Sequence, residues 1–171
     1  DSKVYVGGDF SEGIFRLNAD GSLDNTFVVG SGFNDSVSTI VPVGDGSGDI
    51  YVGGFFTKYQ DDDVGGLVRL TDKGEMIVNY LGSQEIQAVV SAGIGPTYPY
   101  RDGYVYSGGS VKPSLARWTE NGIVDSDFKA SSGIDPVFSV ALVEGGSGAV
   151  YAGGGFAGGL NRIDVFGNTG G

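Results

Sequence analysis

The side chains of this sequence that are able to do chemistry are mostly carboxylates. The chain has 21 Asp and Glu residues, and it has neither His nor Cys. The absence of Cys excludes disulfides, thiolate zinc sites and cysteine nucleophiles, and the absence of His removes the usual general base and the usual nitrogen ligand of a metal. The chemistry left is carboxylate acid–base catalysis, as in glycoside hydrolases or lyases, and binding of a hard cation through oxygen atoms.

Catalysis by carboxylates requires a pair with a defined geometry. A glycosidase needs two carboxyl groups that face one sugar, about 5 to 9.5 Å apart according to its mechanism. Most acidic residues here fall at turns between short apolar segments, where carboxylates are ordinarily solvated. We therefore expect no catalytic residues and no enzyme, and keep a polysaccharide-degrading domain as the alternative.

Alternating oxygen donors make Ca²⁺ the one candidate cofactor. The stretches that carry such donors are Asp45, Ser47 and Asp49; Asp20, Ser22 and Asp24; and Asp61, Asp62 and Asp63. None has a complete calcium loop with its bidentate Glu, and the first stretch needs no ion to form a turn. We expect no cofactor, with calcium at Asp45, Ser47 and Asp49 as the alternative.

The elements that must position these residues follow a repeat. The phrase Tyr-x-Gly-Gly begins at Tyr5, Tyr51, Tyr106 and Tyr151, at intervals of about 50 residues. An apolar segment precedes the phrase, an Arg-centred segment follows it, and a Gly-containing turn then leads to a last segment that ends on an aromatic residue. Their lengths, their β-branched and aromatic content and their Gly-rich boundaries predict four short strands per repeat, which we name a, b, c and d.

Each predicted strand recurs at fixed places in the chain. Strand a is expected at 37–43, 86–92 and 137–143; strand b at the Tyr-x-Gly-Gly phrases; strand c at 14–18, 67–71, 115–119 and 160–164; and strand d ends at Phe27, Tyr80 or Phe128.

Two residue types occupy constant positions in this repeat. Strand c carries Arg16, Arg69, Arg117 or Arg162, and a shared position predicts a shared structural task, namely pairing with a carboxylate of the same or the next repeat. The double Gly after Tyr-x predicts a close approach of neighbouring sheets. The alternatives are a ring of ligand-binding arginines and glycines that leave room for a ligand.

The connections between strands b and c differ in every copy, and variable loops on a constant frame are the usual place of recognition. A second variable region is the insertion at 95–103 between strands a and b. The candidate binding residues in these regions are Tyr59, Asp61, Asp62, Asp63, Tyr98, Tyr100, Arg101 and Lys112. For Tyr98 and Tyr100, packing within the loop is the alternative.

The aligned copies resemble the delta-60 repeat, a bacterial β-propeller repeat. The first copy carries the resemblance in Val4-Tyr-Val-Gly-Gly-Asp-Phe10 and in Phe15-Arg-Leu-Asn-Ala-Asp-Gly-Ser-Leu-Asp-Asn-Thr-Phe27, and the second is nearly as similar. The third and fourth depart from the pattern at Trp118 and at Asp164-Val-Phe-Gly167. The resemblance implies a propeller-like fold in large bacterial secreted or surface proteins or in phage particles, and it implies no catalytic residues.

The predicted fold is all-β, built from β-propeller-type repeats of four-stranded antiparallel blades. The expected units are a partial blade at 1–33, blades at 34–82 and 83–130, and a partial blade at 131–171. Three and a half blades are too few for a closed ring. We expect that the chain belongs to a longer protein or that several copies complete the assembly.

Charge and hydropathy limit the partners. The formal charge of −11 and the pI of about 4.1 disfavour nucleic acid. No apolar segment is long enough to span a membrane, and the first residues lack the pattern of a signal peptide. The function predicted is a non-catalytic structural or binding scaffold at an extracellular, cell-surface or virion surface, which recognises a protein or glycan; a self-assembling fibre or virion subunit is a further alternative.

Overall fold

The computed structural model describes residues 2–92, 103–143 and 148–170. These residues form fourteen β-strands in antiparallel sheets and no helix, so the all-β propeller-type fold predicted from the repeat is confirmed. Within the same residues there is no helix long and apolar enough to cross a membrane.

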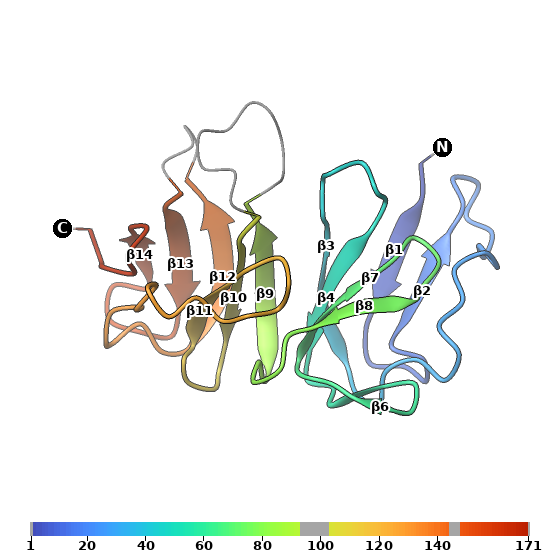
Figure 1. Ribbon diagram of the computed structural model, residues 1–171, viewed down its shortest axis with the longest axis horizontal. Coiled ribbons are helices and arrows are strands. Elements are labelled where there is room, and N and C mark those ends of the chain that lie inside the picture. The colour runs from blue at the N-terminus through green and yellow to red at the C-terminus, as the bar shows by residue number, and fades with distance from the viewer. Residues whose placement is uncertain (1, 93–102, 144–147, 171) are drawn as a thin grey trace.

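Four groups of strands follow one another along the chain (Figure 1). Blade 1 pairs β1 (Val4–Gly7) with β2 (Ile14–Leu17); blade 2 has the order β3 (Val37–Pro42), β4 (Ile50–Gly54), β7 (Leu67–Leu70) and β8 (Met76–Asn79). Blade 3 joins β9 (Ile86–Ser91), β10 (Val105–Gly109) and β11 (Leu115–Trp118), and blade 4 joins β12 (Val137–Leu142), β13 (Val150–Gly154) and β14 (Leu160–Ile163). A small hairpin, β5 (Lys58–Tyr59) with β6 (Asp62–Asp63), lies between β4 and β7.

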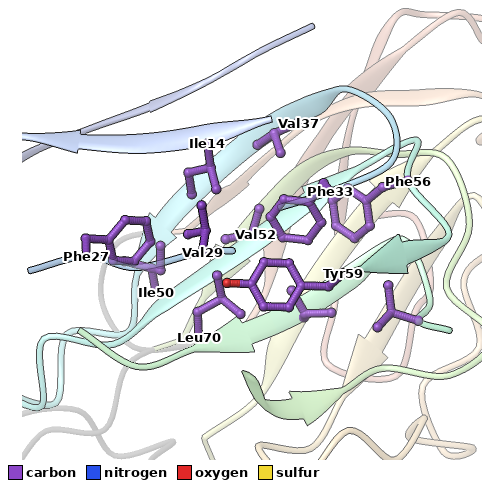
Figure 2. Close-up of a cluster of buried hydrophobic side chains, with 12 residues drawn as sticks. Ile14, Phe27, Val29, Phe33, Val37, Ile50, Val52, Phe56, Tyr59 and Leu70 are labelled. Atoms are coloured by element: carbon purple, nitrogen blue, oxygen red, sulfur yellow. The ribbon is translucent and has the colours of Figure 1, made fainter. Parts of the chain in front are cut away.

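The blades stack face to face, with blades 1 and 4 at opposite ends of the molecule (Figure 1). Strand a of blade 3, β9, contacts strand a of both neighbouring blades, β3 and β12. Three buried apolar clusters fill the three spaces between successive blades. Figure 2 shows the first of them, where Ile14 of blade 1 meets Val37 and Val52 of blade 2. The core of this protein is therefore a series of interfaces between blades.

Strand d is complete in blade 2 alone among the described residues. In the other blades the segment forms a single bridge, Leu17 with Leu23, Trp118 with Val124, and Ile163 with Thr169. In blades 1 and 3, the residue after the bridge is an Asp, Asp24 or Asp125. Its backbone oxygen accepts a hydrogen bond from the N–H of Phe27 or Phe128, so the chain turns there instead of continuing as a strand. Blade 2 has Ile77 at this position and continues as β8.

The two glycines of the repeated phrase lack room for a side chain for two different reasons. A Cβ on the first would lie 2.5 Å from Val37 Cγ1 at Gly7, 2.7 Å from Ile86 Cγ2 at Gly53 and 2.6 Å from Val137 Cγ1 at Gly108. These neighbours belong to strand a of the following blade, as the repeat predicted. A Cβ on the second glycine would strike a backbone carbonyl near the start of strand a of the same blade, namely Ser36 O at Gly54, Glu85 O at Gly109 and Pro136 O at Gly154.

Candidate functional site

The repeated arginine sits in a buried polar cluster. In blade 1, Arg16 Nε donates to Asp24 Oδ2 at 2.8 Å, and its Nη1 donates to the hydroxyl of Tyr5 at 3.0 Å. The guanidinium also lies over the ring of Phe27, 5.2 Å from its centroid. Its Nη1 further donates to the carbonyl of Asp72 in blade 2 at 2.7 Å. Arg16 therefore joins strands b and c of blade 1, and the segment 24–27 that follows them, to the following blade.

Blade 3 repeats this cluster. Arg117 Nε donates to Asp125 Oδ2 at 2.8 Å, and Nη1 donates to the carbonyl of Val165 in blade 4 at 2.8 Å. The guanidinium lies over Phe128, and Tyr106 packs edge-on to the same ring. The predicted structural task of the arginines is thus seen in blades 1 and 3, where a carboxylate of the same repeat is the partner.

In blade 2, the repeated Arg pairs with carboxylates from a different segment, and a different residue contacts the following blade. Because Ile77 replaces the Asp of strand d, Arg69 pairs with Asp49 at 2.7 Å and with Asp45 at 3.1 Å, both in the turn between β3 and β4. The contact to the following blade is made by Tyr80, whose hydroxyl donates to the carbonyl of Glu120 at 3.2 Å.

The carboxylates of these clusters are held in the ionised form. Hydrogen bonds from the hydroxyl and N–H of Thr26, and then from Lys3 and Arg16, lower the pKa of Asp24 well below its usual range. The pKa of Asp125 is also lowered: burial opposes this, but the backbone N–H of Asp127 and the guanidinium of Arg117 outweigh it. These groups are therefore permanent acceptors and are poorly suited to proton transfer near neutral pH.

The predicted calcium residues take part in the Arg69 cluster. Asp45 accepts hydrogen bonds from Ser47 N at 2.9 Å and from Arg69 Nη2 at 3.1 Å. Asp49 is buried against the same guanidinium. Within the described residues, no group of three or more acidic side chains is arranged to hold a metal ion. Arg69 supplies the positive charge that a cation would bring to this turn.

The hairpin β5–β6 holds the first group of predicted binding residues. Tyr59 is only 2% exposed, its hydroxyl donates to the carbonyl of Gly74, and its ring packs on Phe33 with centroids 4.6 Å apart (Figure 2). Burial raises its pKa to about 12. In contrast to the predicted ligand contact, Tyr59 supports the hairpin from beneath, as part of the first core.

The acidic tip of the same hairpin faces solvent. Asp61, Asp62 and Asp63 are all exposed, and Asp63 pairs with Lys58 at 2.7 Å across the hairpin. This pairing lowers the pKa of Asp63 and raises that of Lys58. Asp61 lies in the turn of the hairpin and Asp62 of β6 pairs with Tyr59 of β5, and both carboxylates are exposed. Recognition by this loop stays a prediction.

Lys112 lies at a cleft between the b–c loop of blade 3 and the crossover into blade 4. The cleft has a volume of about 510 Å³ and is lined by residues 112–115 and 130–135. Asp135, in the crossover, binds two residues of the b–c loop: Ser114 Oγ donates to Oδ1 at 2.5 Å, and Lys112 Nζ lies 3.3 Å from Oδ2. Leu115 and Ile134 form the apolar floor.

A cleft of about 340 Å³ occupies the equivalent place in blade 2. Its lining comes from the b–c connection, residues 55–57 and 64–66, and from the crossover at 81–85. Crossover residues such as Asp135 were missed by the sequence interpretation, because it placed recognition in the b–c loops and in the insertion at 95–103. The signal that could have found them is the repeat itself, which brings each crossover beside the b–c loop of the blade it leaves.

The remaining predicted binding residues, Tyr98, Tyr100 and Arg101, lie outside the described residues.

Comparison with known proteins supports the fold of the first repeat. Residues 1–27 match a family model described as a domain of unknown function (DUF5122) beta-propeller. The matched stretch contains β1, β2 and the Arg16–Asp24 pair, which is the most regular copy of the repeat. A search of curated proteins found no match. The comparison supports a β-propeller-type family over these residues.

Proposed function

We propose that the chain is a non-catalytic scaffold of delta-60-type propeller repeats, which binds a protein or glycan at an extracellular or virion surface through its b–c edge. This edge comprises the b–c loops and the crossovers between blades. The proposal rests on one observation. The repeated Tyr, Gly and Arg residues pack between blades, whereas the clefts at equivalent places in blades 2 and 3 have different linings.

The chemistry of the two loops differs in a way that suits recognition. The blade 2 loop presents the exposed carboxylates of Asp61 and Asp62. The blade 3 loop presents Lys112, whose side chain is 81% exposed, above hydroxyl and carboxylate groups of Ser114 and Asp135. A cleft that combines an apolar lining with a few hydroxyl and carboxylate groups is a typical ligand-binding site. This combination suits a glycan or a peptide segment.

A non-catalytic role is supported by the state of the buried carboxylates. Asp24 and Asp125 are each bound to an arginine and to backbone or hydroxyl donors. A general acid needs a raised pKa, and in both groups the pKa is lowered.

The test is a binding screen of the purified chain against immobilised glycans and cell-surface or virion proteins. For any ligand found, the variants Asp61→Asn with Asp62→Asn, and Lys112→Ala, should reduce affinity at least tenfold, at unchanged melting temperature. Lys73→Ala is the matched control, because Lys73 is an exposed lysine in the turn between β7 and β8, outside both clefts. Unchanged binding in both loop variants would refute the b–c edge, and release of reducing sugar from a polysaccharide panel would refute the non-catalytic assignment.

A further inference from the structure

The cleft of blade 2 is lined by an exposed aromatic residue that the other copies of the repeat lack. Phe55 directly follows the Gly-Gly of the repeated phrase, where the other blades have smaller side chains, namely Asp9, Ser110 and Gly155. Phe55 is 39% exposed, and it lines the cleft together with Leu81, which is 70% exposed. Because smaller residues serve at this position in the other blades, the fold does not require an aromatic ring here.

Glu85, at the end of the crossover in the same cleft, has an unusual backbone conformation. Its φ of 47° lies in the left-handed region that favours glycine, whereas φ is not positive at the equivalent Ser36 and Pro136. Its carbonyl packs on Gly109 of blade 3, but its side chain is exposed and has no hydrogen bond or ion pair within the described residues. Backbone strain at the rim of a cleft is typical of a residue whose side chain has a function.

The loop and the crossover that form this cleft are acidic. The hairpin β5–β6 and the crossover from β8 to β9 lie at the same edge of the molecule (Figure 1). Residues 55–66 and 81–85 carry four carboxylates and one lysine, a net formal charge of −3. The lysine, Lys58, is already paired with Asp63. In the equivalent cleft of blade 3, Lys112 and Asp135 pair with each other and leave no net charge.

The polar groups of the blade 2 cleft suit a cation better than a glycan. Both hydroxyls of its lining are engaged within the protein: Ser83 Oγ donates to the carbonyl of Tyr80 at 2.7 Å, and Thr57 Oγ1 accepts from Asn34 Nδ2 at 3.1 Å. A neutral glycan brings no charge to compensate the carboxylates, and an acidic glycan is repelled by them. A cation is attracted by the carboxylates and can also lie over the exposed ring of Phe55.

We infer that this cleft binds a basic peptide segment of a protein partner, in which a large apolar side chain is flanked by Lys or Arg. The apolar side chain packs against Phe55 and Leu81, and the flanking cations are bound by Glu85 and by the carboxylates of the hairpin. The volume of about 340 Å³ lies at the small end of the range of ligand pockets and suits one large side chain. This inference rests on the proposed function and narrows it, because it selects a protein over a glycan at the blade 2 cleft.

The test is isothermal titration calorimetry of the full chain with short synthetic peptides that are acetylated and amidated. The probe peptide has one Trp flanked by lysines. One comparison peptide carries Glu in place of each Lys, and another carries Gly in place of the Trp. The probe should bind about tenfold more tightly than either comparison peptide, and added salt should weaken its binding, because salt screens the attraction between opposite charges.

Three substitutions separate the contributions of the cleft residues. Phe55→Ser introduces the residue that blade 3 carries at this position, and Glu85→Gln removes the charge of the side chain. Each should weaken binding of the probe about tenfold, the loss expected for one charge-assisted or aromatic contact. Glu85→Gly should weaken binding equally without lowering the melting temperature, because glycine adopts a positive φ without strain. A purely structural role of Glu85 would not separate binding from stability in this way.

The matched control is Glu75→Gln. Glu75 is an exposed glutamate in the turn between β7 and β8 and lines neither cleft, so this variant should bind the probe like the wild type. An equal loss in Glu75→Gln and Glu85→Gln would overturn the inference, because the charge of the whole chain would then attract the peptide. A probe that binds no more tightly than the Glu peptide, or that binds undiminished to both Phe55→Ser and Glu85→Gln, would overturn it as well.

Failure of this inference differs from failure of the proposed function. A glycan that binds the b–c edge and is lost in the loop variants, with no binding of the probe peptide, would remove the basic peptide and leave the scaffold function intact. A chain whose b–c edge binds neither the probe nor any glycan or protein of the screen would remove both.

Discussion

The cluster of Arg16, Tyr5, Phe27 and Asp24 shows how one residue position can be required for reasons that do not involve a ligand. Its guanidinium is bound by a carboxylate, a hydroxyl and a backbone carbonyl of the following blade. Because the cluster is buried, removal of one charged partner leaves the other without compensation. This is a structural unit, and it accounts for the constant Arg of the repeat.

Asp24 should make the stability of the protein sensitive to acid. Its pKa in the folded state lies well below the ordinary value, chiefly because Thr26 and then Lys3 and Arg16 bind the carboxylate. The unfolded chain therefore takes up a proton first as the pH falls. The stability that Asp24 contributes is present above the unfolded pKa of about 4 and is lost as the pH falls toward the folded pKa.

The expected result is that Asp24→Asn unfolds more easily than the wild type at pH 7, and that the difference shrinks as the pH is lowered from 5 to 2. Urea unfolding at fixed pH values measures this, with Asp61→Asn at an exposed loop position as the control for loss of one negative charge. A difference that stays constant over this pH range would contradict the role given to the ionised Asp24.

The first glycine of the repeated phrase offers a matched pair of substitutions. In Gly108→Ala the new Cβ would lie 2.6 Å from Val137 Cγ1, whereas in Gly153→Ala the nearest atom is 3.7 Å away. We expect Gly108→Ala to destabilise the fold by about 1–3 kcal/mol through overpacking, and Gly153→Ala to be nearly neutral. Equal losses of unfolding free energy in the two variants would show that the glycines serve something other than contact between blades.

At the scale of strands, the sequence predicts the sheets better than their edges. Strands a, b and c are found in every described blade in which they were expected. Strand d was expected in three copies and is complete only in blade 2. The reason was visible in Asp24 and Asp125, since Asp favours a turn by accepting backbone hydrogen bonds. Tyr59 was harder to place, because a Tyr in a polar loop shows no periodicity that would indicate its contact with Phe33.

The pairing of β10 with β11 contains a compensated departure from the repeat. Trp118 replaces the Leu found in blades 1 and 2, and its indole N–H donates to Ser107 Oγ at 2.8 Å. Ser107 in turn replaces the Val that the phrase carries in the same two blades. The variant Ser107→Val should lose about 1–3 kcal/mol of unfolding free energy, because the buried N–H loses its acceptor. In the double variant with Trp118→Leu, part of this loss should be recovered, since both residues of the usual pair are restored.

A double-mutant cycle by urea unfolding measures this coupling. Trp118→Leu alone is the reference for the loss of buried indole surface. Strictly additive effects of the two substitutions would mean that Ser107 and Trp118 do not depend on each other.

At the scale of the whole molecule, the repeat predicted the architecture, because each copy contributes the same buried faces to successive interfaces. It could not predict that strand d is interrupted in blade 4, where the described segment after Ile163 forms a single bridge to Thr169. It also could not predict the clefts, because each combines a loop of one blade with a crossover to the next.

The calcium alternative can be tested through the melting temperature of the whole chain. The carboxylates of Asp45 and Asp49 are paired with Arg69, so a divalent ion at this turn would have to displace or approach a guanidinium. We therefore expect the melting temperature to be the same with a chelator as in millimolar Ca²⁺ at constant ionic strength. Mg²⁺ is the necessary control, because any divalent cation screens a chain of charge −11. A rise in melting temperature that Ca²⁺ produces and Mg²⁺ does not, and that Asp45→Asn removes, would instead establish a calcium site in the turn between β3 and β4.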